Sequence, residues 1–172
     1  MTEFEAAHPE TPQGQAVFQE LLFIHAAIRH DLAVVERLAG EVTSGLPPHE
    51  LDAEIHQLQT NGPLWQLKVN CLRYCRFVHL HHHIEDTAFF PSLRAANPAL
   101  APVVEKLEAD HRGVAQLLDQ VEAAATALHE DDGDGSRARV SVALEELHGA
   151  LIAHLDYEEN SAGPTIRRMR HL

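Results

Sequence analysis

Apolar residues return every three or four positions along four long stretches of the chain, which is the period of an amphipathic helix. Polar breaks rich in Gly, Pro, Asn and Asp separate these stretches. The pattern predicts helices at 13–39, 63–89, 97–130 and 137–161, with a short extra helix near 49–60. No segment alternates convincingly between polar and apolar residues. We therefore expect an all-α protein that folds as an antiparallel up-down four-helix bundle.

The length of 172 residues suits one domain. We expect a flexible leader at 1–12, the bundle at 13–164 and a basic tail at 165–172. Proline ends helices because it lacks the backbone N–H and crowds the preceding turn. The second helix is therefore expected to stop at Pro91, and the fourth at Pro164.

Charge and cysteine content narrow the class of protein. The formal net charge is −13, which disfavours nucleic acids and anionic membranes as partners. No apolar run approaches the ~18–20 residues of a membrane span, and the polar N-terminus predicts no signal peptide. Cys71 and Cys75 lie four apart in a predicted helix, a poor geometry for a disulfide, so we expect reduced core residues. We expect a cytoplasmic protein, as a monomer or a weak dimer.

Histidine interrupts each of the four apolar faces near its middle. Two of these faces also carry a glutamate four residues later, at a spacing that places both side chains on one side of a helix. A carboxylate inside a bundle is costly unless it is paired or bound to a metal, and histidine is a common metal ligand. The pattern predicts a metal centre built from His25, His81, Glu85, His111, His154 and Glu158.

An internal repeat supports this interpretation. The spacing His81-x3-Glu85-x5-Pro91 recurs in the fourth helix, from His154 to Pro164, and each copy follows a helix with one inward histidine. Two such helical hairpins, paired antiparallel, would bring four imidazoles and two carboxylates together. That set suits two metal ions bridged by carboxylates, and it is compatible with iron, zinc or manganese. A buried polar network without metal is the alternative.

Other inward and outward positions follow from the same helical projection. Phe77 and Ile84 share the inward stripe of the second helix, whereas His79, His82 and His83 point away from it. We expect these three histidines to form a solvated surface cluster, with secondary metal binding as the less favoured alternative. Arg29 lies one turn after the inward histidine of the first helix. We expect it to pair with one of the two inward glutamates or to extend to solvent.

Four segments carry a resemblance to the hemerythrin HHE family: HAAIRHDL, HHHIEDTAFFP, EADHRGVAQLL and HLDYEENSAGP. The similarity covers nearly all of residues 20–164. It implies a four-helix bundle around a non-haem di-iron centre, with an oxo or hydroxo bridge and two bridging carboxylates. By position, the resemblance assigns as ligands the six residues found above.

One departure from the family pattern concerns Ala115. Oxygen-carrying members have a second histidine there, four residues after the third-helix ligand. One metal should therefore have a vacancy or a substitute ligand. Tyr74, seven residues before His81, is the best inward candidate, although a buried tyrosine bonded to a backbone group or water is the favoured interpretation. Tyr157, three residues after His154, is expected to line the pocket edge.

The resemblance also implies a function. Its members bind or react with small oxygen and nitrogen species, and a site with fewer histidines is more open to peroxide or nitric oxide. We favour redox detoxification, with O2, peroxide or nitric oxide as the small-molecule ligand. As an enzyme, the protein would be a di-iron oxidoreductase acting on peroxide or nitric oxide. The alternative is an oxygen, iron or redox sensor, or an iron store, without turnover.

Overall fold

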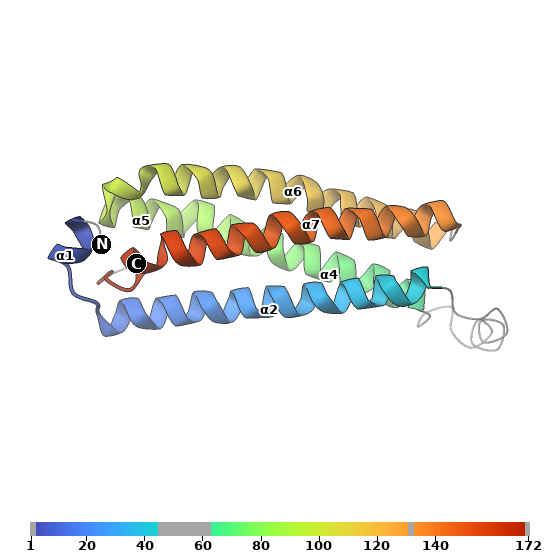
Figure 1. Ribbon diagram of the computed structural model, residues 1–172, viewed down its shortest axis with the longest axis horizontal. Helices are drawn as coiled ribbons and strands as arrows, with labels where there is room; N and C mark the ends of the chain where they lie inside the picture. The colour runs from blue at the N-terminus through green and yellow to red at the C-terminus, as the bar shows by residue number, and fades with distance from the viewer. Residues whose placement is uncertain (1–2, 45–62, 131–132, 171–172) are drawn as a thin grey trace.

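The computed structural model of the protein describes residues 3–44, 63–130 and 133–170 (Figure 1). Within these ranges the chain is helical and contains no strand. The long helices are α2 (Pro12–Thr43), α4 (Pro63–Ile84), α6 (Ala101–Glu130) and α7 (Asp134–Ser161). Shorter elements are α1 (Glu3–Ala7), the π-helix η1 (Glu85–Phe89), α5 (Phe90–Ala96), the 3-10 helix η2 (Pro98–Leu100) and α8 (Gly163–Ile166). The extra helix predicted near 49–60 lies outside the described residues.

The long helices form a closed ring of four neighbours. Helix α2 packs against α4 and α7, and α6 packs against the same two helices, so α2 and α6 lie diagonally opposite each other. Figure 1 shows the four running side by side in alternating directions. The predicted all-α, antiparallel up-down bundle is therefore confirmed. None of the described helices combines the length and the apolar character needed to cross a membrane.

The two ends of the chain meet at one end of the bundle. Thr11 caps α2: its side-chain oxygen accepts a hydrogen bond from the Gly14 N–H at 2.9 Å, and its hydroxyl donates to the carbonyl of Met169 at 2.6 Å. Its own backbone N–H donates to the carbonyl of Arg167 at 2.9 Å. Ile166 and Met169 are buried. The segment expected to be a basic tail thus contributes to the core, because Ile166 and Met169 pack into an apolar cluster with Phe18 and Leu107.

The prediction that the second helix stops at Pro91 is wrong. After α4 the chain makes a π turn, in which the Phe90 N–H donates to the carbonyl of Glu85, and it then continues as α5. Pro91 occupies the first turn of α5, where no backbone N–H is required. Pro164 is placed in the same way in the first turn of α8. Both prolines of the repeat therefore begin a new short helix.

The core consists of two apolar layers separated by a polar band. One layer includes Ile28, Val78 and Val114, and the other includes Leu21 and Leu107. Between them, at one level along the bundle, every long helix contributes buried polar side chains. Metal ligands placed in such a band would be shielded from bulk water on both sides.

Candidate metal centre

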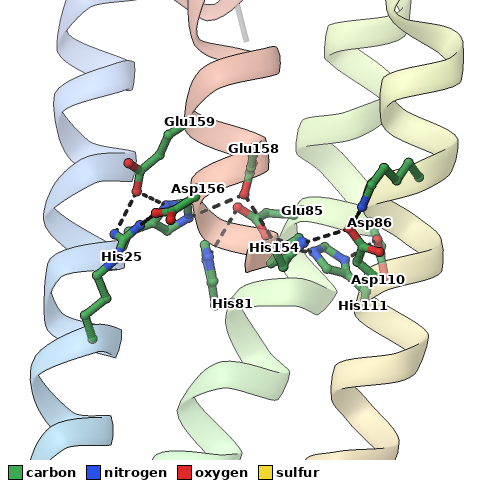
Figure 2. Close-up of polar contacts among 12 residues, drawn as sticks. His25, His81, Glu85, Asp86, Asp110, His111, His154, Asp156, Glu158 and Glu159 are labelled. Carbon is green, nitrogen blue, oxygen red and sulfur yellow. Dashed lines mark hydrogen bonds and ion pairs between the residues drawn. The ribbon is translucent and has the colours of Figure 1, made fainter. Parts of the chain in front are cut away.

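All six residues predicted as metal ligands lie in this polar band (Figure 2). None of them is more than 7 % exposed. One imidazole comes from each of the four long helices, so residues far apart in the sequence point toward one another between the helices. The six are His25, His81, Glu85, His111, His154 and Glu158.

Glu85 connects the imidazoles of two helices. Its Oε1 lies 3.3 Å from Nε2 of His81 on α4, and its Oε2 lies 3.5 Å from Nε2 of His111 on α6. The two oxygens of one carboxylate therefore face the imidazoles of two different helices.

Glu158 occupies the matching position on the other side of the band. Its Oε2 lies 3.4 Å from Nε2 of His25 and 3.9 Å from Nε2 of His154. Nε2 of His154 also lies 3.2 Å from Nε2 of His111. The ε nitrogens of four helices thus converge on the two carboxylates.

The donor atoms fall into two groups, each compact enough for one metal ion. Within each group the candidate ligand atoms lie within 4.8 Å of one another, and all the residues are buried. Glu85 belongs to both groups. The first group is His25, His81, Glu85 and Glu158, and the second is His82, Glu85, His111 and His154.

The expectation that His82 faces solvent is wrong. Its side chain is buried, and its ring stacks on His111 with centroids 4.0 Å apart. The inward face of α4 is wider than the single stripe used for the prediction, and Ile84, placed on that stripe, is 52 % exposed. A usable signal was the heptad spacing, because His82 follows the buried Cys75 by seven residues.

His25 is oriented by a carboxylate on α7. Its Nδ1 lies 2.9 Å from Oε1 of Glu159, and Arg29 donates to the same oxygen at 2.8 Å and to Asp156 at 2.8 Å. Arg29 therefore pairs with neither Glu85 nor Glu158, contrary to one of the two expectations. An ionised carboxylate only accepts hydrogen bonds, so Nδ1 of His25 carries a proton, which leaves Nε2 as the nitrogen that can bind a metal ion in the band.

His111 is oriented in the same way by Asp86. Nδ1 of His111 lies 2.7 Å from Oδ1 of Asp86, and the ring of Phe90 stacks on it at a centroid distance of 5.2 Å. Both partners come from the π turn or the residue just after it. The π turn thus places a candidate ligand, Glu85, next to the residue that holds another ligand, which agrees with the frequent occurrence of π turns at functional sites.

Burial sets the protonation of the imidazoles. It lowers the pKa of His81 to about 3 and that of His111 to about 2, with neighbouring histidines adding to the effect. Burial also lowers the pKa of His82 and His154. These rings are neutral at neutral pH, which is the form that binds metal. Burial, followed by the adjacent Glu158, raises the pKa of Glu85. A bound cation would offset this cost of ionising a buried carboxylate.

The residues fit a metal ion better than a closed polar network. Most of the buried side-chain nitrogen and oxygen atoms without a hydrogen-bond partner, within the described ranges, lie in this band. They include Nε2 of His25 and His81 and both carboxylate oxygens of Glu85 and Glu158. Buried polar atoms without a partner are rare and costly. Here these atoms are the ones that could bind metal ions as ligands.

The two tyrosines singled out from the sequence lie at different distances from the centre. Tyr74 is buried two helical turns before His81, which is about 10 Å along the axis. The residues lining the pocket beside it, such as Asp31 and Arg73, include none of the donor residues. Burial raises its pKa, and its hydroxyl has no hydrogen-bond partner. The structure therefore places Tyr74 away from the vacancy predicted at Ala115.

Tyr157 lies nearer the centre, next to Glu158 on α7. It is half-buried, packs against the apolar layer around Phe18, and its ring centroid lies 4.4 Å from Nζ of Lys106. Its role at a pocket edge stays a prediction. Cys71 and Cys75 are buried and reduced, and the prediction that they are core residues is confirmed.

The comparison with known families agrees with this geometry. The model of the hemerythrin HHE cation-binding domain matches residues 49–166, more than half of the chain. The chain belongs to this family. No curated protein and no solved structure matches this HHE protein. The family match begins after α2, so the place of His25 in the hemerythrin-type centre rests on its contacts with Glu158 and Glu159.

Proposed function

We propose that this HHE protein holds two non-haem iron ions and that the centre binds or reacts with O2, peroxide or nitric oxide in redox detoxification. The observation that carries the proposal is the pair of buried donor groups that share Glu85, in which both glutamates and Nε2 of His25, His81 and His82 lack hydrogen-bond partners. A mixed set of imidazoles and carboxylates suits iron. The cytoplasmic location and the monomeric or weakly dimeric state stay predictions.

The residues divide between the two ions. His25 and His81 would hold one iron, His111 and His154 would hold the other, and the carboxylates between them would serve both. When bound, the irons supply Lewis acidity and a source or acceptor of electrons. The outer carboxylates of Glu159 and Asp86 keep the ligating imidazoles fixed in ring orientation and tautomer.

Burial restricts the external ligand to small molecules. Apolar layers close the band from both directions along the bundle. A groove of about 470 Å³ between α6 and α7 reaches His154, and its wall is built partly from Ala109, Gly113, Ala150 and Ala153. Such small side chains leave room for a diatomic molecule or for peroxide beside the ligand. These observations support small oxygen and nitrogen species as ligands and argue against bulky organic substrates.

Measured turnover separates reaction from sensing or storage. Iron-loaded protein would be mixed with a large excess of peroxide, or of nitric oxide, and consumption would be followed against iron content. The proposal predicts consumption well beyond the iron present. Consumption that stops at the iron stoichiometry would leave the sensor or storage function.

A variant that cannot hold iron shows how much peroxide is consumed by iron that is not bound to the protein. His81→Ala removes a donor from the first group, so it should lose iron and consume peroxide only at the background rate. His79→Ala removes a partly exposed histidine two residues earlier on the same helix and should behave as wild type.

A further inference from the structure

We propose that His82 is a metal ligand and replaces the histidine that is missing at Ala115. This inference rests on the proposed di-iron centre and adds to it a fifth imidazole. His82 would join His111 and His154 on one ion, so that the two ions differ in their number of nitrogen ligands.

The burial of His82 requires a partner. Only 5 % of the residue is exposed, and its Nε2 has no hydrogen-bond partner. A buried imidazole nitrogen without a hydrogen bond is destabilising. His83, the next residue, is exposed, so the chain does not bury histidine indiscriminately along this stretch. A bound metal is the partner that accounts for the position of His82.

The contacts of His82 assign it to one ion. One of its ring nitrogens lies within 4.8 Å of ligand atoms of Glu85, His111 and His154. Its ring lies 4.0 Å from that of His111 and 5.1 Å from that of His154, measured between centroids. It therefore belongs with the imidazoles of α6 and α7, although its own helix is α4.

A histidine at position 115 would have belonged to this same group of ligands. Ala115 lies one turn after His111 on α6, so a histidine there would reach the ion that His111 holds. That position is filled instead from across the helix interface. The result is three imidazoles on the ion near His111 and two on the ion near His25.

Three variants test this assignment. His82→Ala removes the imidazole, His82→Phe keeps a ring of similar size that can pack on His111 but has no nitrogen donor, and His83→Ala is the matched control. Each protein would be loaded with ferrous iron under anaerobic conditions. Iron per chain and the affinity of each ion would be measured by competition with a chelator.

The expected result is the same defect in both His82 variants. The affinity for one of the two ions should fall at least tenfold, and His83→Ala should match wild type. Adding Ala115→His to His82→Ala should restore the second ion. Two ions at wild-type affinity in His82→Phe would overturn the proposal, and so would a loss confined to His82→Ala, because the ring would then act by packing alone. A failure of Ala115→His to restore binding would overturn the replacement of that position.

A measurement on the wild-type chain covers the case in which the variants fail to fold. In zinc-loaded protein, long-range nitrogen–proton NMR of the histidine rings should show Nε2 of His82 with the shift of a metal-bound nitrogen. The shift of a free neutral imidazole nitrogen would refute the assignment. If wild-type protein fails to bind two iron ions, the proposed function itself fails. If it binds two and His82→Phe does the same, only the role of His82 is lost.

Discussion

Replacing Glu159 tests whether the outer carboxylates prepare the centre for metal. Glu159→Ala removes the hydrogen bond that fixes the Nδ1 proton of His25 and one of the two carboxylates that bind Arg29. Without that bond the ring of His25 is free to rotate and to carry its proton on Nε2, the nitrogen that faces Glu158. We expect a weaker site for the ion near His25, with the other ion little affected.

The size of the effect follows from the geometry. The side chain of Glu159 is 21 % exposed, and the Nδ1–Oε1 distance is 2.9 Å, so the bond is a partly shielded, charge-assisted one. Loss of such an outer partner lowers metal affinity by about 10–100-fold, or ~1.4–2.7 kcal/mol. The metal-free protein should lose only about 1–2 kcal/mol of stability, because the ion pair with Arg29 is near the surface.

Asp156→Ala is the matched control. Asp156 binds the same arginine at 2.8 Å, but its side chain is 59 % exposed and it has no contact with His25. Iron affinity would be measured by chelator competition, and unfolding of the metal-free proteins by urea titration. Affinity should fall in Glu159→Ala and change by less than about twofold in Asp156→Ala. Equal iron affinity in Glu159→Ala and wild type would show that Glu159 does not prepare His25 for metal binding.

Two further predictions concern the scaffold. Gly14→Ala should cost about 1–3 kcal/mol, because a Cβ there would lie 2.5 Å from backbone oxygens of residues 166–167. In Gly113→Ala the new Cβ meets no atom within 4 Å, so this variant should be more stable by about 0.5–1 kcal/mol. Urea unfolding of the two metal-free variants measures both changes in stability. Equal changes in stability would contradict the packing argument. Burial raises the pKa of the Cys71 and Cys75 thiols to about 12, so the folded chain retains protons that the unfolded chain releases above about pH 9. Stability should therefore fall as pH rises from 9, and less steeply in the Cys71→Ala/Cys75→Ala double variant. An identical slope in that variant would show that the thiols are not responsible.

The sequence predicted the bundle because each long helix carries a continuous apolar face. The boundary at Pro91 could not be predicted in the same way. Proline interrupts the hydrogen bonds of an α-helix, but a π turn at Glu85 carries the chain past it, and π turns depend on tertiary packing. The burial of Ile166 was missed because two arginines follow it and make the segment resemble a solvated tail.

The candidate site was predicted to the extent that its residues repeat in the sequence. His81 and Glu85 stand out because their spacing recurs at His154 and Glu158, and the structure places all four in the same band. His82 has no counterpart in the repeat, since Leu155 follows His154. The outer partners were also missed, because an exposed-looking acidic residue on a helix has no signature that distinguishes it from an ordinary surface carboxylate.

The metal content of the protein decides whether its buried polar band is a di-iron centre. Protein produced with iron available would be analysed for metal per chain, and its optical spectrum recorded before and after addition of peroxide. A di-iron centre would give about two irons per chain, charge-transfer absorption typical of a bridged iron pair, and a spectral change with peroxide. Protein without iron, folded and helical under the same conditions, would show that the polar band holds another metal or none, and the proposed function would fall with it.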